Sequence, residues 1–287
     1  MSLIFLLFAP AATVSYVLEG YTQHEDSAGH AGILGPGDVQ WMVAGKGIVH
    51  AEFQMPLHEE GMPDPEGLQL WIDLPAKDKG IEPSYQDMSS KDITVVHPSE
   101  DVEIKVISGE SHGEKGPMRP VGGCWYFDFR LKKKGAKMFQ PLPNGWTSFI
   151  YCKFHFLAPQ KPRRLFTYLT TVLSGGLRVG NESAERAPHH TIVLSANEGE
   201  DGVWLEATQE GLTRGVLIAG EPLKQNVVQV GHSKQAPPRT KRLTISVQYG
   251  PFVTTSMQEV RQAIEDYQNG ENGFESAKYW RSEIGNR

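Results

Sequence analysis

The stretch GPGDVQWMVAGKGIVHAE, residues 35–52, predicts both the fold class and a site. It opens with a turn, GPGD, and continues into apolar, β-branched and aromatic residues that are typical of strands. Near its end, His50 and Glu52 stand two residues apart. Side chains at positions i and i+2 of a strand point to the same face of the sheet, so this imidazole and this carboxylate converge. The pair predicts half of a metal site.

Strand-like runs of this kind recur along the chain, separated by Gly, Pro, Asp and Asn. A first set occupies 13–20, 30–45, 68–74, 93–97 and 102–110. A second set occupies 124–131, 145–151, 175–180, 189–195, 203–207 and 213–223. Short strands at this spacing are typical of a sandwich or a barrel. The two similar sets predict a duplicated β-barrel. Because the second set lacks a His-x-Glu pair, we predict that only the first copy keeps the metal chemistry.

The C-terminal part has a different, helical pattern. In the run 256–270, Ser256 and Glu259 form a capping box, the apolar residues recur on one face, and Gly270 supplies a stop. The sequence therefore predicts a helix over 256–270. A second short helix is expected over 273–280, packed beside the first.

Composition narrows the class of protein. The 287 residues include 30 Gly and 19 Pro, a proportion that suits an all-β protein, and the net charge of −6 argues against nonspecific nucleic-acid binding. Two cysteines are too few for a disulfide framework, which indicates a reducing compartment. No apolar run reaches the ~18 residues of a transmembrane helix. We expect residues 1–12 to be a first strand or a mis-set start rather than a secretory signal.

Several motifs, in the same order across 13–287, resemble the pirin family of bicupin proteins: TVSYVLEG, HED…GH…PGDVQWMVAGKGIVHAE, GLQLWIDL, EPSYQD, VISGE, GWTSFIY, AGEPL and YGPFV…NGFESAKYWRSEIGN. The resemblance implies an all-β fold of two stacked antiparallel cupin β-barrels with short C-terminal helices. We expect the N-terminal barrel at 1–118 and the C-terminal barrel at 119–287. The resemblance also implies an iron(II) cofactor, held in the N-terminal barrel by three His and one Glu.

Carried over by motif, His50 and Glu52 match the third and fourth metal ligands of the family. Counting back from Thr13 places the first two at Leu6 and Phe8, which have no donor atoms. Iron(II) in an oxygenase needs about three or four fixed N/O ligands, so half of the set would hold it weakly. The resemblance also implies a flavonol-cleaving activity, and in that reaction Glu52 would accept the proton of the 3-hydroxyl group.

Other residues near the motif have weaker claims to a site. His24 and His30 are expected to be turn and surface residues, and His58, in the loop after the strand, is a minor candidate to approach the pair. The pair His189-His190 is expected to be structural, because neighbours on a strand face opposite ways. Residues 40–42, Gln-Trp-Met, either line the pocket or pack in the core.

The resemblance implies two functions that share one site, and a third outcome remains open. The first is an iron-dependent quercetin 2,3-dioxygenase with flavonol and O2 as substrates. The alternative is a non-enzymatic nuclear coregulator that binds a transcription factor. The third is a metal-free degenerate paralogue. We expect a monomer in nucleus and cytoplasm, with no direct nucleic-acid or membrane contact.

Two stretches, 152–173 and 230–248, interrupt the family pattern and are rich in Lys, Arg and Pro. We hypothesise that both are intron sequence, since Cys152-Lys153-Phe154 can be encoded by TGTAAGTTT, which contains the donor-like GTAAGT. The alternative is a pair of surface loops, in which KPRR (161–164) and PPRTKR (237–242) resemble basic localisation or phosphate-binding patches.

Sequencing the expressed transcript tests the intron hypothesis. We expect a message that lacks both stretches and carries a His-x-His segment upstream of Thr13. A message that retains both stretches in frame contradicts the hypothesis.

Overall fold

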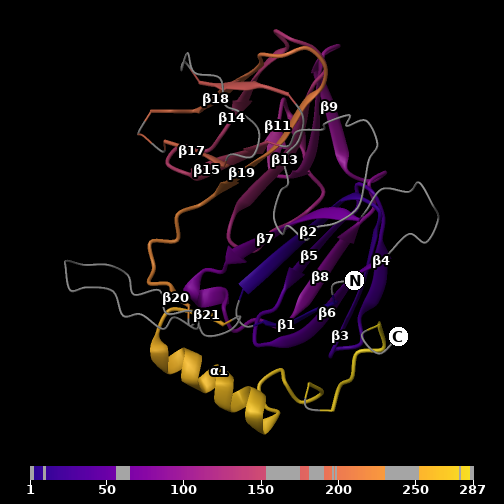
Figure 1. The fold of residues 1–287 in the computed structure, drawn as a ribbon. Helices are drawn as coiled ribbons and strands as arrows, with labels where there is room; N and C mark the ends of the chain where they lie inside the picture. The colour runs from indigo at the N-terminus through magenta and orange to yellow at the C-terminus, as the bar shows by residue number, and fades with distance from the viewer. Residues whose placement is uncertain are drawn as a thin grey trace, which may run out of the picture. The chain divides into compact units, whose positions relative to one another are not determined.

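The computed structural model describes residues 3–8, 11–55, 65–152, 175–180, 191–195, 197, 199–229, 252–277 and 279–284. The chain divides into two compact units. Unit 1 comprises Met1–Lys91 and Leu223–Arg287, and unit 2 comprises Asp92–Pro222. Strands dominate both units (Figure 1), and every strand pairing among the described residues is antiparallel. The expected all-β class is confirmed.

Unit 1 is built from two four-stranded sheets. The first has the order β1 (Leu3–Phe8), β6 (Ile48–Met55), β3 (Tyr21–Asp26) and β4 (Ala31–Leu34). The second has the order β7 (Glu66–Asp73), β2 (Ala11–Glu19), β5 (Val39–Val43) and β8 (Ser84–Met88). The unit also contains a short 3-10 helix, η1 (Ala76–Asp78), the pair β20 (Val228–Gln229) and β21 (Val253–Thr254), and helix α1 (Met257–Asn269). Strands β2 and β5 are buried along almost their whole length, so both of their faces are covered.

Unit 2 is built around a six-stranded sheet. Its order is β17 (Thr191–Leu194), β15 (Thr147–Cys152), β19 (Thr213–Gly220), β13 (Cys124–Leu131), β10 (Val102–Ser108) and β9 (Thr94–Ser99). A three-stranded sheet has the order β14 (Lys137–Pro141), β18 (Gly202–Ala207) and β16 (Leu177–Val179), and β11 (Glu110–Ser111) pairs with β12 (Glu114–Lys115). The two sheets contribute to one apolar core, which includes Ile104, Phe129, Ile150, Leu177 and Leu205.

The two units divide the chain at places other than the boundary expected at 118/119. Strand β10 pairs with β13 from Val102 to Ser108, which keeps β9–β12 in unit 2. The C-terminal segment from Leu223 belongs to unit 1 because Phe252 and Phe274 pack there against Val49 of β6.

The C-terminal helix forms where the sequence predicts it, but the second helix does not. Helix α1 (Met257–Asn269) begins after Ser256, whose hydroxyl accepts a hydrogen bond from the backbone N–H of Glu259 at 3.2 Å. It ends at Gly270, which has a left-handed backbone with φ 73°. The prediction of a helix over 273–280 is wrong, and the described residues there form turns. Left-handed φ angles at Asn272 and Gly273 break the helical path.

Phe274 fixes the start of the strand that carries His50 and Glu52. Its ring is fully buried and packs with Phe252, Ala277 and Val49. The ring lies over Gly47, where an added Cβ would stand 2.0 Å from a ring carbon. Gly47 also has φ 153°, a backbone conformation that favours glycine. The glycine before β6 is therefore required by close packing against the C-terminal segment.

Replacing Phe274 tests this packing. We expect Phe274→Ala to lower the free energy of unfolding by about 3–5 kcal/mol, because it leaves a cavity under β6. The control is Tyr279→Ala in the same segment, whose side chain is 78% exposed and whose loss should change stability by less than about 0.5 kcal/mol. Urea denaturation measures both, and equal effects of the two variants would contradict the assignment.

Candidate functional site: a buried polar cluster in unit 1

Two rows of polar side chains meet between the sheets of unit 1. In the first sheet, His24 on β3 pairs with Glu52 on β6, and Asp26 pairs with His50. In the second sheet, directly paired positions on β7, β2, β5 and β8 form the row Gln69–Ser15–Gln40–Asp87. Directly opposed residues of an antiparallel pair point to the same face, so each row is continuous. Hydrogen bonds join the two rows.

Glu52 is held by side chains from both sheets. The Ser15 hydroxyl donates to Oε1 at 2.7 Å, and the Gln69 amide donates to Oε2 at 2.7 Å. His50 Nε2 lies 3.3 Å from Oε1. Burial raises the pKa of Glu52, but the hydrogen bond and charge of His50 and the hydrogen bond from Ser15 outweigh it and leave the pKa below its ordinary value. The carboxylate is therefore ionised and oriented, although Glu52 is only 8% exposed.

His24 belongs to the same cluster, so the expectation of a turn and surface residue is wrong. Its side chain is buried, and its ring centroid lies 6.0 Å from that of His50. The Gln40 amide nitrogen lies 3.0 Å from Nε2 of His24 and also donates to Asp87 at 3.0 Å. Burial lowers the pKa of His24, although the Asp87 carboxylate opposes this effect. The imidazole is therefore neutral at pH 7, the form that binds metals.

A buried carboxylate shapes the turn next to the cluster. Asp26 accepts hydrogen bonds from the backbone N–H groups of Ala28 and His30, at 2.7 and 3.0 Å. The His30 side chain remains 52% exposed, as expected for a surface residue. The ring of Tyr85 stacks near His30, and burial together with Asp26 raises the pKa of the Tyr85 hydroxyl. Tyr85 therefore keeps its proton.

The other residues expected at the site differ in where the structure places them. Among residues 40–42, Gln40 reaches the cluster, whereas Trp41 and Met42 are buried, and Met42 packs with Ala44 and Ile48. His58, His189 and His190 lie outside the described residues, as do 153–173 and 230–248.

Sequence reasoning missed Ser15, Gln69 and Asp87. For Ser15 and Gln69, the available signal was a single polar residue inside each of the apolar runs VSYV and LQLWI.

Two atoms that can bind a metal ion face each other in the cluster, His50 Nε2 and Glu52 Oε1. The position matched to one missing family ligand, Leu6, is paired with His50, and Phe8 is paired with Ile48. Both positions thus lie on β1, the strand next to β6, but leucine and phenylalanine have no ligand atoms. In the part of the chain that the structure describes, no three His, Cys, Asp or Glu side chains are placed to hold a metal ion together.

Comparison with known proteins places the chain among relatives of one kind. The Pirin family model matches residues 8–72, and the Pirin C-terminal cupin domain matches residues 156–232. Human Pirin is 42% identical over 278 residues, which cover 96% of this chain and 79% of that protein. Pirin-like protein 2 of Arabidopsis thaliana is 38% identical, with 94% of this chain and 71% of that protein covered.

Solved structures agree in fold. A quercetin 2,3-dioxygenase from Acinetobacter baumannii superposes with a TM-score of 0.73 at 27% identity, covering 94% of this chain and 79% of that one. The bacterial pirin YhhW of Escherichia coli, solved in complex with nickel(II), matches with a TM-score of 0.51 at 16% identity over 76% of each chain, which shows the fold alone. No helix among the described residues has the length and apolar character needed to cross a bilayer. With its two cupin-type halves and its close relatives, the chain belongs to the pirin family.

Proposed function

We propose that unit 1 binds a divalent metal ion, iron(II) by family resemblance, through His50 and Glu52, and that the protein acts on flavonols as a quercetin 2,3-dioxygenase. The observation that carries the proposal is the buried His50–Glu52 pair, 3.3 Å apart, with the carboxylate fixed by Ser15 and Gln69. The similarity to the Acinetobacter baumannii enzyme supports the substrate class.

The residues present fit a metal ion as a two-ligand site. An imidazole nitrogen and a carboxylate oxygen suit iron(II) and nickel(II), and both side chains are buried. His24 adds a neutral imidazole beside them. Because Leu6 and Phe8 contribute no donors, we expect weaker binding than at a site with four protein ligands.

The chain's own groups supply positioning and a proton acceptor. The ionised Glu52 accepts the proton of the acidic flavonol hydroxyl, a role that needs a carboxylate of low pKa held in one orientation. Gln69 provides that orientation by holding Oε2 while its own carbonyl accepts a hydrogen bond from Trp71 at 3.0 Å. A bound divalent ion would act as a Lewis acid and stabilise the flavonol oxyanion.

The substrates and binding partners of this function are also proposals. A flavonol and O2 follow from the reaction itself. Binding to a transcription factor in the nucleus, by a monomer that contacts neither nucleic acid nor membrane, stays a prediction from the family resemblance.

Metal titration of the purified full chain tests the metal site directly. We expect one Fe(II) or Ni(II) per chain by anaerobic calorimetry and elemental analysis. His50→Asn and Glu52→Gln should each weaken binding at least about tenfold, because each removes one of two protein ligands. The control is His30→Asn, an exposed imidazole of the same unit. Unchanged affinity in both site variants would show that the ion binds elsewhere.

Oxygen consumption with quercetin tests the activity. Glu52→Gln should lower kcat/KM by about 10²–10⁴-fold through loss of the proton acceptor. Gln69→Leu keeps the ligands but frees Oε2, so we expect a loss of about 10–100-fold. If the metal-loaded protein consumes no O2 with quercetin, the dioxygenase proposal is wrong and the metal site stands alone.

A further inference from the structure

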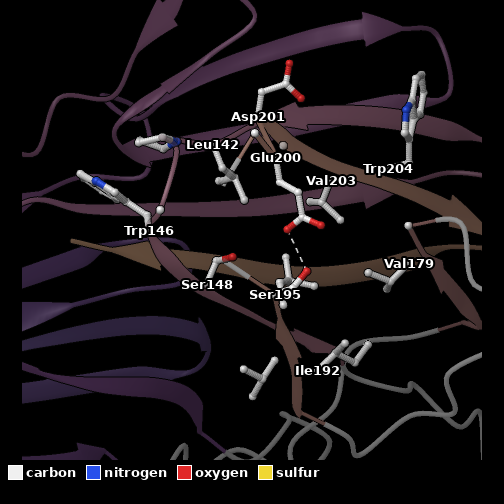
Figure 2. Close-up of a pocket in the computed structure, with 17 residues that line it drawn as sticks. Leu142, Trp146, Ser148, Val179, Ile192, Ser195, Glu200, Asp201, Val203 and Trp204 are labelled. Atoms are coloured by element: carbon white, nitrogen blue, oxygen red, sulfur yellow. Dashed lines mark hydrogen bonds between the residues drawn. The ribbon is translucent and has the colours of Figure 1, made fainter. Parts of the chain in front are cut away.

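Unit 2 contains a cavity that the proposed function does not use. Its volume is about 710 Å³, within the usual range of small-molecule sites. Figure 2 shows it between β15 and β17 on one side and β18 on the other. Its apolar walls come from both sheets and consist of Leu142, Val179, Ile192, Leu194 and Val203. The cavity thus offers a half-open space with apolar walls and polar groups beside them.

One buried hydroxyl faces this space. Ser148 lies on β15, paired with Leu194 on β17 and with Ala219 on β19, and only 2% of it is exposed. Figure 2 shows its oxygen on the cavity side. The hydroxyl is therefore placed to meet a polar group of a bound ligand.

A fixed carboxylate stands at the mouth. Glu200 accepts hydrogen bonds from the Ser195 hydroxyl at 2.9 Å, and from the backbone and side-chain nitrogens of Asn197 at 3.2 Å each. These hydrogen bonds, of which the one from Ser195 has the largest effect, lower the pKa of Glu200. Its carboxyl group is therefore ionised at neutral pH. They occupy three of roughly four lone-pair positions, which leaves one for a ligand.

The charge of the cavity has one sign. Glu200 and Asp201 both contribute to its lining, and none of the described residues that line it is Lys or Arg. Figure 2 shows the Glu200 carboxylate over the cavity and the Asp201 carboxylate directed away from it. An anionic ligand such as a flavonolate would therefore be repelled, whereas a cation would be attracted.

We propose that this cavity binds a small organic amine. Its ammonium group would donate a hydrogen bond to Glu200 at the mouth. Its hydrocarbon or aromatic body would pack against Val179, Ile192 and Val203, and Ser148 would take a second polar contact. The proposal is independent of the metal site, which lies in unit 1.

Calorimetry and ligand-observed NMR on the full chain test it with three probes that share one aromatic body: phenethylamine, phenethyl alcohol and phenylacetate. We expect one phenethylamine per chain. The alcohol should bind about tenfold more weakly, since it lacks the charge-assisted hydrogen bond. Phenylacetate should not bind. Equal binding of the amine and the acid would overturn the proposal.

Two variants and a control locate the site. Glu200→Gln should remove the preference for the amine over the alcohol. Ser148→Val should weaken the binding of both ligands, because the larger side chain occupies part of the cavity. The control, Glu114→Gln, removes an exposed carboxylate on β12 of the same unit, away from the cavity lining. Circular dichroism checks that each variant is folded. Amine binding that Glu200→Gln leaves unchanged would place the amine elsewhere and overturn the assignment.

Discussion

The structure of unit 1 depends on one buried negative charge that two sheets share. Removing a carboxylate from water is costly unless donors replace the water, and Ser15 and Gln69 of the second sheet supply those donors to Glu52 of the first. The hydrogen bonds form only when β2, β6 and β7 are all in their observed registers. A slip of one residue would turn the polar row of either sheet to its other face. The same contacts that align the sheets therefore also orient the carboxylate for chemistry.

Local patterns predicted most of the elements of this fold. Alternating burial along β10, with Val102, Ile104 and Val106 inside, is the period-two signal from which strands are predicted. The capping box predicted α1 because all of its contacts lie within four residues. The helix expected over 273–280 fails for a local reason as well, since Asn272 and Gly273 adopt left-handed backbones that deliver Phe274 to Gly47.

Long-range pairing is what the sequence left undetermined in the site. His24 follows a turn-like context, and only the pairing of β3 with β6 places it opposite Glu52 inside the unit. Gln69 reaches Glu52 across 17 residues of chain and from another sheet, so no spacing rule indicates it. The His50–Glu52 pair was accessible because both residues lie on one strand. Motif carry-over selected Leu6, and the structure then places it on the neighbouring strand β1, in direct register with His50.

The two units differ in how the chain supplies them, and this affects the order of folding during synthesis. Unit 2 is continuous from Asp92 to Pro222, whereas unit 1 takes its last part from Leu223 onward. At about 5–20 residues per second, a ribosome needs roughly 10–40 s to advance from Lys91 to Phe274. During that interval the first half of unit 1 has left the ribosome without the side chain that covers Gly47 and Val49. Unit 2 is complete first, and the barrel that holds His50 and Glu52 closes last, although its strands are made earliest.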